Sequence, residues 1–124
     1  MFVATANGES LGSDSLEELD ASLTEIENVQ PLELSISVVG GPSLIMLRSE
    51  EHAFLMYLRE SGDSGFVSGR SVPATPTARF RLGNGQLDEY SIAWCIPVED
   101  CFKAVLFFYV NSGLQPAWVT WHES

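Results

Sequence analysis

The sequence predicts a single α+β domain over residues 1–124, with two helices packed on a mostly antiparallel β-sheet. Hydrophobic residues make up 45% of the 124 residues, a fraction typical of one globular domain. Two stretches, one before residue 30 and one after residue 97, repeat apolar residues with the period of a helix. The segments around them alternate or carry short apolar runs, so the expected order is strand, helix, a meander of strands, helix, strand.

The first strand is expected at Phe2–Ala6 and is followed by a Gly-rich loop. Ser13 or Asp14 is expected to cap the first helix, because a side-chain oxygen there can accept from the free amides of the first turn. The helix should end near Asn28, ahead of a proline. Its buried stripe is predicted at Leu16, Leu19, Leu23 and Ile26.

The meander follows from period-two patterns and from turn residues. Strands are predicted at 32–38, 44–48 and 53–58, with a short one at 66–67 inside a loop. The segment 53–58 is apolar on both faces, which is typical of a central strand. Further strands are predicted at 78–82 and 90–96, joined through a Gly-Asn-Gly turn.

The second helix is expected to start near Pro97, with Glu99 and Asp100 in its first turn, where the helix dipole favours negative charge. Gly113 is expected to be its C-cap. A last strand should then carry Trp118 and Trp121 on opposite faces, leaving one of them exposed.

Charge is the most informative bulk property of the chain. Seventeen acidic residues face six basic ones, giving a formal net charge of −11. Such a charge disfavours direct binding of nucleic acid or of anionic membranes, and it suits a basic protein partner. Solubility alone is the alternative reading of this charge. Because the first 33 residues hold eight acids and no Lys or Arg, one side of the domain is expected to be much more negative than the rest.

Membrane and redox signals are weak. No apolar run approaches the roughly 20 residues of a membrane span, and no signal peptide is recognised, so a cytoplasmic location is expected. Cys95 and Cys101 are predicted to be buried thiols, since their spacing fits neither a redox nor a zinc motif. A metal site with His122 is the alternative, without support from ligand spacing. We expect no metal and no cofactor.

Catalytic motifs are not found either. His52 and His122 are the only histidines, and no nucleophile elbow, phosphate loop or dinucleotide fingerprint occurs. The adjacent acid pairs are better explained as exposed charge than as hydrolase dyads, because neighbouring residues point in different directions. We therefore expect a binding protein and not an enzyme, with a carboxylate-pair hydrolase as the alternative.

The predicted partner-binding residues are acids at turns, together with one aromatic side chain beside such acids. An aromatic residue next to carboxylates is the arrangement expected of a hot spot for a basic partner. These residues are Glu50, Glu51, Glu60, Asp63, Asp88, Glu89 and Tyr90.

The last 40 or so residues carry a series of short motifs. In order they are Gly83-Asn84-Gly85, Glu89-Tyr90, Ile96-Pro97-Val98, a helix with Phe107-Phe108 that ends in Asn111-Ser112-Gly113, and Pro116-x-x-Val119-x-Trp121-x-Glu123. This series resembles the immunity proteins of bacterial polymorphic toxin systems, specifically the family numbered first in their classification. Gln115 stands where that family often has an arginine before the proline, and the first half of the chain is similar only in length and strand-rich character.

The resemblance implies an antitoxin of interbacterial competition that binds one cognate toxin domain in a one-to-one complex and blocks its active site. It implies a toxin that acts on nucleic acid, a deaminase or a nuclease, whose basic substrate groove an acidic inhibitor would occupy. The motif residues themselves are explained as structural and are not assigned as toxin contacts. The alternative is an acidic adaptor or secretion chaperone that binds a basic partner without inhibiting it.

Overall fold

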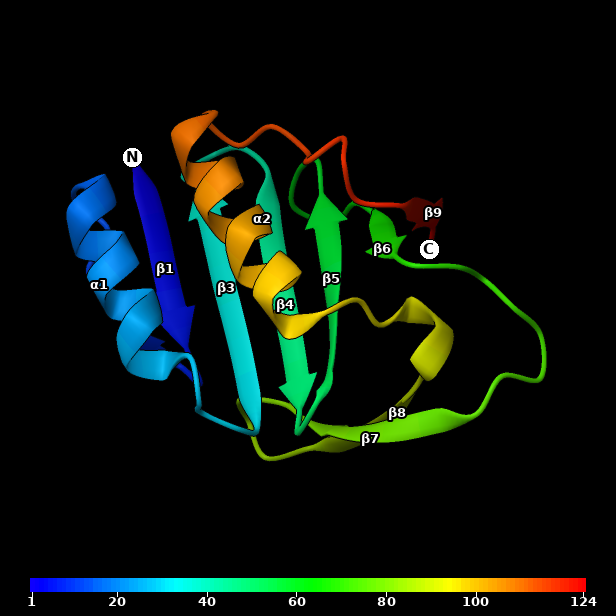
Figure 1. Cartoon of the computed structure of the whole chain (residues 1–124). Coiled ribbons are helices and arrows are strands. Elements are labelled where there is room, and N and C mark those ends of the chain that lie inside the picture. Colours follow the sequence, from blue (N-terminus) through cyan, green and yellow to red (C-terminus); the bar gives the residue numbers. More distant parts are fainter.

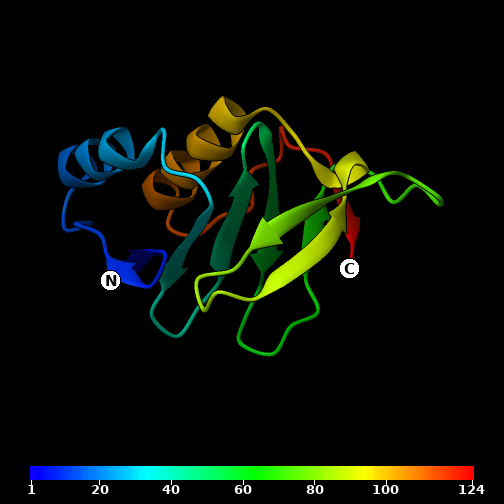
Figure 2. The ribbon, with the colours of Figure 1, turned by 90° about the horizontal axis from the view of Figure 1, so that it is seen from below.

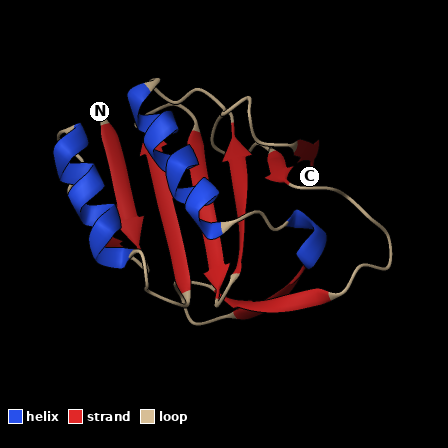
Figure 3. Ribbon diagram, viewed as in Figure 1, coloured by secondary structure: helices blue, strands red, loops and turns tan.

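The computed structural model describes residues 1–124, and it confirms the α+β class (Figures 1 and 3). A seven-stranded antiparallel sheet has the order β2-β1-β3-β4-β5-β6-β9, and β7 and β8 form a separate two-stranded sheet. The elements are β1 (Phe2–Ala6), β2 (Glu9–Ser10), α1 (Leu16–Ile26), β3 (Leu32–Val38), β4 (Ser43–Ser49), β5 (His52–Leu58), β6 (Phe66–Ser68), β7 (Thr77–Arg81), β8 (Leu87–Ser91), the 3-10 turn η1 (Ile92–Trp94), α2 (Val98–Val110) and β9 (Trp121–Glu123).

Helix α1 begins one or two residues later than predicted. Ser15, and not Ser13 or Asp14, is the N-cap, because its backbone is extended and its hydroxyl accepts from the Glu18 amide at 3.1 Å. Leu19 and Leu23 are buried as predicted, whereas Leu16 is exposed. The buried stripe is therefore shorter than the sequence indicated.

Helix α2 ends at a tight turn that depends on Gly113. The prediction of Gly113 as the C-cap was wrong by two residues, because Asn111 is the C-cap. Gly113 follows in the turn, and its amide donates to the carbonyl of Phe108 at 2.8 Å. Gly113 has a φ of +92°, and a Cβ there would lie 2.8 Å from Cγ of Pro42. Both the backbone conformation and the neighbouring chain therefore require glycine.

Both helices cover the same face of the sheet (Figures 1 and 2). Alternate residues of β1, β3, β4 and β5 point toward them, as the period of two predicted. Phe108 of α2 is fully buried against this face, and the hydroxyl of Tyr57 on β5 donates to the carbonyl of Gly113 at 2.7 Å. The main core thus lies between the two helices and the middle of the sheet.

A smaller core lies on the opposite face of the sheet, under the β7–β8 hairpin. Leu47 of β4, Phe54 of β5, Val67 of β6 and Phe80 of β7 are buried there. The hairpin crosses the sheet where β4 ends and β5 begins (Figure 2). Strand β5 therefore has buried residues on both faces, which confirms it as a central strand.

Two strand predictions were wrong in extent. The strand expected at 90–96 is β8, which ends at Ser91, because the Ser91 hydroxyl accepts from the Ala93 amide at 3.1 Å and starts the η1 turn. The last strand, β9, contains only Trp121–Glu123. Trp118 is 49% exposed, but it lies in the loop before β9 and not on a strand face.

Candidate functional site

A groove runs between the two helices on the outer side of the helical layer. Two adjoining hollows of about 210 and 190 Å³ form it, and they share Glu27, Glu99 and Phe102 in their walls. We call it the acidic groove and define it by its lining residues, Asp20, Leu23, Thr24, Glu27, Asn28, Val98, Glu99, Phe102, Lys103 and Leu106.

Helix periodicity explains how these residues come together. On α2, Glu99, Phe102 and Leu106 recur at spacings of three and four residues, so they share the side that faces α1. On α1, Asp20 and its neighbours Leu23 and Thr24 follow the same spacing. Leucine and phenylalanine side chains form the floor of the groove, and the carboxylates stand on its rims.

The carboxylates of the acidic groove have no ionic partner within the chain. The only salt bridges are Arg59–Asp63 and Arg79–Glu89, and neither involves the groove. Asp20, Glu27 and Glu99 are exposed, and Lys103 is the single basic residue in the lining. The groove therefore presents a net negative rim around an apolar floor, an arrangement that fits a segment with both basic and apolar side chains.

Arg48 ties the β4–β5 turn to the end of this groove. Its Nε donates to the carbonyl of Glu50 at 2.9 Å, and its Nη1 donates to the carbonyl of Glu27 at the end of α1. The guanidinium thus binds one orphan carbonyl at the C-terminus of α1, where positive charge is favourable, and one carbonyl of the turn. The contact holds the β4–β5 turn, which carries the predicted partner-binding residue Glu50, near the end of α1.

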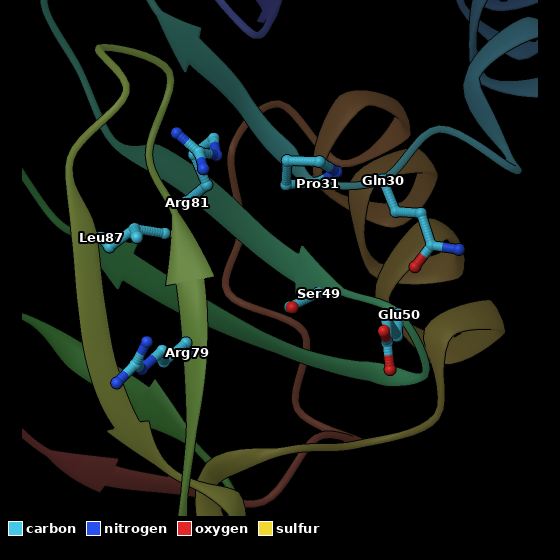
Figure 4. A pocket seen from close by; sticks show the side chains of 7 residues that line it. All are labelled: Gln30, Pro31, Ser49, Glu50, Arg79, Arg81 and Leu87. Carbon is cyan, nitrogen blue, oxygen red and sulfur yellow. The ribbon is translucent and has the colours of Figure 1, made fainter.

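A second hollow, of about 360 Å³, lies between the β4–β5 turn and the β7–β8 hairpin (Figure 4). Arg79 and Arg81 project from β7 toward it, with Glu50 and Ser49 across from them. Nε of Arg79 lies 3.8 Å from Oε1 of Glu89, and Nη1 of Arg81 donates to the carbonyl of Gly85 at 3.3 Å. This surface of the hairpin is mixed in charge and is not an acidic patch.

The structure does not bring the predicted partner-binding residues together. Glu50 and Glu51 lie at the β4–β5 turn, whereas Glu60 and Asp63 lie in the β5–β6 loop at the opposite end of β5. Asp63 accepts from Nε and Nη2 of Arg59, both at 2.9 Å. These bonds lower the pKa of the Asp63 carboxyl well below its usual range, so its charge is already compensated.

Tyr90 is not the exposed hot spot that its neighbours suggested. Its ring lies 5.1 Å from Phe54 and 5.7 Å from Trp94, which makes it a half-buried part of the smaller core. Its hydroxyl donates to Asp88 at 3.2 Å, and burial, together with the Asp88 charge, raises the pKa of Tyr90 above its ordinary value. Glu89 points the other way, accepts from the Thr77 hydroxyl at 2.9 Å and faces Arg79.

Sequence reasoning missed Asp20, Glu27 and Glu99 as site residues, although two signals for them were present. The first is the run of eight acids without a base in the first 33 residues, five of which lie in or directly after α1. The second is the shared helix face of Glu99, Phe102 and Leu106. What the sequence did not contain is the packing of the two helices side by side, which creates the groove.

The remaining reactive side chains are dispersed. His52 begins β5, and Nδ1 of His122 on β9 lies 3.1 Å from the carbonyl oxygen of Gly69. Cys101 is buried and Cys95 is half-buried, and burial raises the pKa of the Cys95 thiol to about 11. No three His, Cys, Asp or Glu residues are grouped closely enough to hold a metal ion.

Comparison with known proteins adds no family to this description. Neither the protein-family models nor the curated protein sequences gave a match to the chain.

Neither helix has the length and apolar character needed to cross a membrane.

Proposed function

We propose that the protein is an inhibitor that binds a basic toxin domain through its acidic groove and blocks the nucleic-acid-binding cleft of that domain. The observation that carries the proposal is the groove between α1 and α2, with unpaired carboxylates of Asp20, Glu27 and Glu99 around an apolar floor. Both features of a tight interface are combined there, namely apolar area for affinity and charge for specificity and rapid association.

The net charge and the C-terminal motifs support the same function. At −11, the chain repels nucleic acid and attracts the cationic surface that an enzyme of nucleic acid needs. The resemblance of residues 83–123 to immunity proteins adds the class of partner, a secreted toxin domain acting as a deaminase or nuclease. On this proposal Glu50 and Glu51 extend the contact where α1 ends and α2 begins, at the bottom of Figure 1, because Arg48 holds their turn near the end of α1.

The test is inhibition of the toxin domain encoded next to this chain's reading frame. The purified domain is assayed on single-stranded and double-stranded nucleic acid while the chain is added in increasing amounts. We expect activity to fall to background at a one-to-one ratio, with a complex of the same stoichiometry in solution. An unrelated basic nuclease, assayed at the same concentrations, controls for non-specific inhibition by a polyanion.

Each other outcome contradicts the proposal. A partner that is bound but stays fully active indicates an adaptor or chaperone. Equal inhibition of the unrelated nuclease indicates a charge effect without specific recognition. Turnover of nucleic acid by the chain alone would make it an enzyme.

A further inference from the structure

The basic side chains of the molecule differ in how far their charge is used within the chain. Arg48 and Arg59 are held by short hydrogen bonds to carbonyl or carboxylate groups. The side chain of Arg81 has no carboxylate partner, and its one hydrogen bond, to a carbonyl, is 3.3 Å long. Arg79 is 75% exposed, and its Nε lies 3.8 Å from Oε1 of Glu89. A chain with 17 acids and six bases thus leaves two guanidinium groups on β7 largely free.

The β7–β8 hairpin carries both arginines on its outer face. Side chains alternate along a strand, so Arg79 and Arg81 point away from the side of Phe80, and their Cα atoms are about 7 Å apart. Phe80 is fully buried, and its ring lies 5.1 Å from that of Phe54 on β5. The inner face of the hairpin is therefore fixed on the sheet, and this fixes the backbone that carries the two guanidinium groups.

The hollow beside these arginines follows directly on the acidic groove. Asn28 lines the groove, and Gln30 lines the hollow of about 360 Å³. The Cα atoms of these two residues are at most about 7 Å apart, because consecutive Cα atoms are separated by about 3.8 Å. Val29 between them is 37% exposed, and Leu87, opposite Arg81 in the hairpin register, is 52% exposed. One partner can therefore cover the groove, these apolar side chains and the arginines together.

We propose that Arg79 and Arg81 bind an acidic side chain of the toxin domain that the acidic groove binds, an inference that rests on the proposed function. Enzymes of nucleic acid hold carboxylates inside a cationic cleft, as ligands of catalytic metal ions in nucleases and as the proton-transferring glutamate in deaminases. An inhibitor of such a cleft therefore meets both signs of charge. The acidic groove complements the cationic walls, and the arginines complement a carboxylate, with which a guanidinium forms two parallel hydrogen bonds.

Glu50, across the hollow from the arginines, decides which kind of anion fits there (Figure 4). Its carboxylate makes no ion pair with either guanidinium. A nucleic acid would bring a row of phosphates against Glu50 and the neighbouring acidic groove, and would be repelled. A single carboxylate on an otherwise basic protein surface leaves a cationic group for Glu50 to meet. The hollow thus favours a protein surface of mixed charge over a polyanion.

The sign of a charge effect separates this contact from general attraction. Arg81→Gln makes the chain more negative, so a basic partner held by net charge alone would bind it as tightly as the wild type, or more tightly. We expect instead that the affinity for the toxin domain, measured by titration calorimetry, falls at least about tenfold, because a carboxylate loses its charged donor. Arg70→Gln is the matched control, because Arg70 is exposed in the loop after β6 and the change in net charge is the same.

Further variants test direct contact with a carboxylate. Arg81→Lys keeps the charge and loses the planar fork, so we expect a loss of affinity between those of the wild type and Arg81→Gln. Each Asp and Glu of the toxin domain is then replaced by Asn or Gln, one at a time. One of these replacements should abolish the difference between Arg81→Gln and the wild type, which identifies the bound acid. Thermal unfolding of every variant checks that it is folded.

The outcomes separate this inference from the proposed function. Equal affinities of Arg81→Gln and Arg70→Gln, together with weaker binding by Glu27→Lys with Glu99→Lys, would overturn the arginine contact and leave the proposed function standing. A loss in Arg81→Gln that no acid of the toxin domain is coupled to would overturn the carboxylate as its partner. A toxin domain that does not bind the wild-type chain would overturn both.

Discussion

At the scale of single residues, Arg48 connects the fold to the acidic groove. Its guanidinium is bound to two backbone carbonyls, those of Glu27 at the end of α1 and Glu50 in the β4–β5 turn. It therefore fixes the end of α1 and the β4–β5 turn without filling the groove. Sequence alone showed an arginine at the end of a strand and gave no sign that it spans to a helix end.

We predict that Arg48→Met lowers the free energy of unfolding by about 1–3 kcal/mol, because two carbonyls lose a charged donor while the aliphatic packing is kept. Urea unfolding measures the change. Arg81→Met is the control, since Arg81 is exposed and makes one long hydrogen bond of 3.3 Å. Equal effects of the two substitutions would contradict the assigned role of Arg48.

The Arg59–Asp63 pair gives the β5–β6 loop a dependence on pH. Because the folded pKa of Asp63 is lowered, the pair contributes stability above the unfolded pKa of about 4, and this contribution is lost as pH falls below that value. We expect Asp63→Asn to be less stable than the wild type at pH 7, with the difference shrinking toward pH 2. Urea unfolding at both pH values tests the sign, and a difference that grows on acidification would contradict it.

At the scale of elements, the sequence predicted both helices and the main strands because their apolar periods are set by core contacts. The 53–58 segment was recognised as central for this reason, and Phe54 and Leu55 are indeed both fully buried. Boundaries were less predictable. Ser15 is the cap of α1 in place of Ser13 or Asp14, and the strand predicted to reach residue 96 ends at Ser91, before η1. In both places the hydrogen bond of a single serine hydroxyl sets the end of the element.

The turn after α2 provides a test at this scale. Gly113→Ala combines a left-handed φ with a Cβ only 2.8 Å from Pro42, whereas Gly85→Ala has a similar φ of +90° and no atom within 4 Å. We therefore expect Gly113→Ala to cost about 1–3 kcal/mol more than Gly85→Ala, the typical cost of overpacking. Thermal or urea unfolding of the two variants measures the difference. Equal losses in the free energy of unfolding would contradict a steric clash of the added methyl group with Pro42.

At the scale of the whole molecule, the distribution of charge was only partly predictable. The run of acids before residue 34 indicated a negative side, and α1 does present those carboxylates outward. The acids predicted to bind a partner do not form one patch. Glu50 and Glu60 lie at opposite ends of β5, and Asp63 is paired with Arg59. Local sequence cannot reveal which helices lie side by side or which charges find a partner.

The affinity of the toxin domain for two charge-reversed variants tests the central claim most directly. Glu27→Lys with Glu99→Lys changes the acidic groove, and Glu60→Lys with Glu123→Lys makes the same change in net charge at exposed positions away from the groove. Titration calorimetry should show a loss on the order of 100-fold in affinity for the groove variant and less than about tenfold for the other. Equal losses, or the larger loss for Glu60→Lys with Glu123→Lys, would contradict binding through the acidic groove.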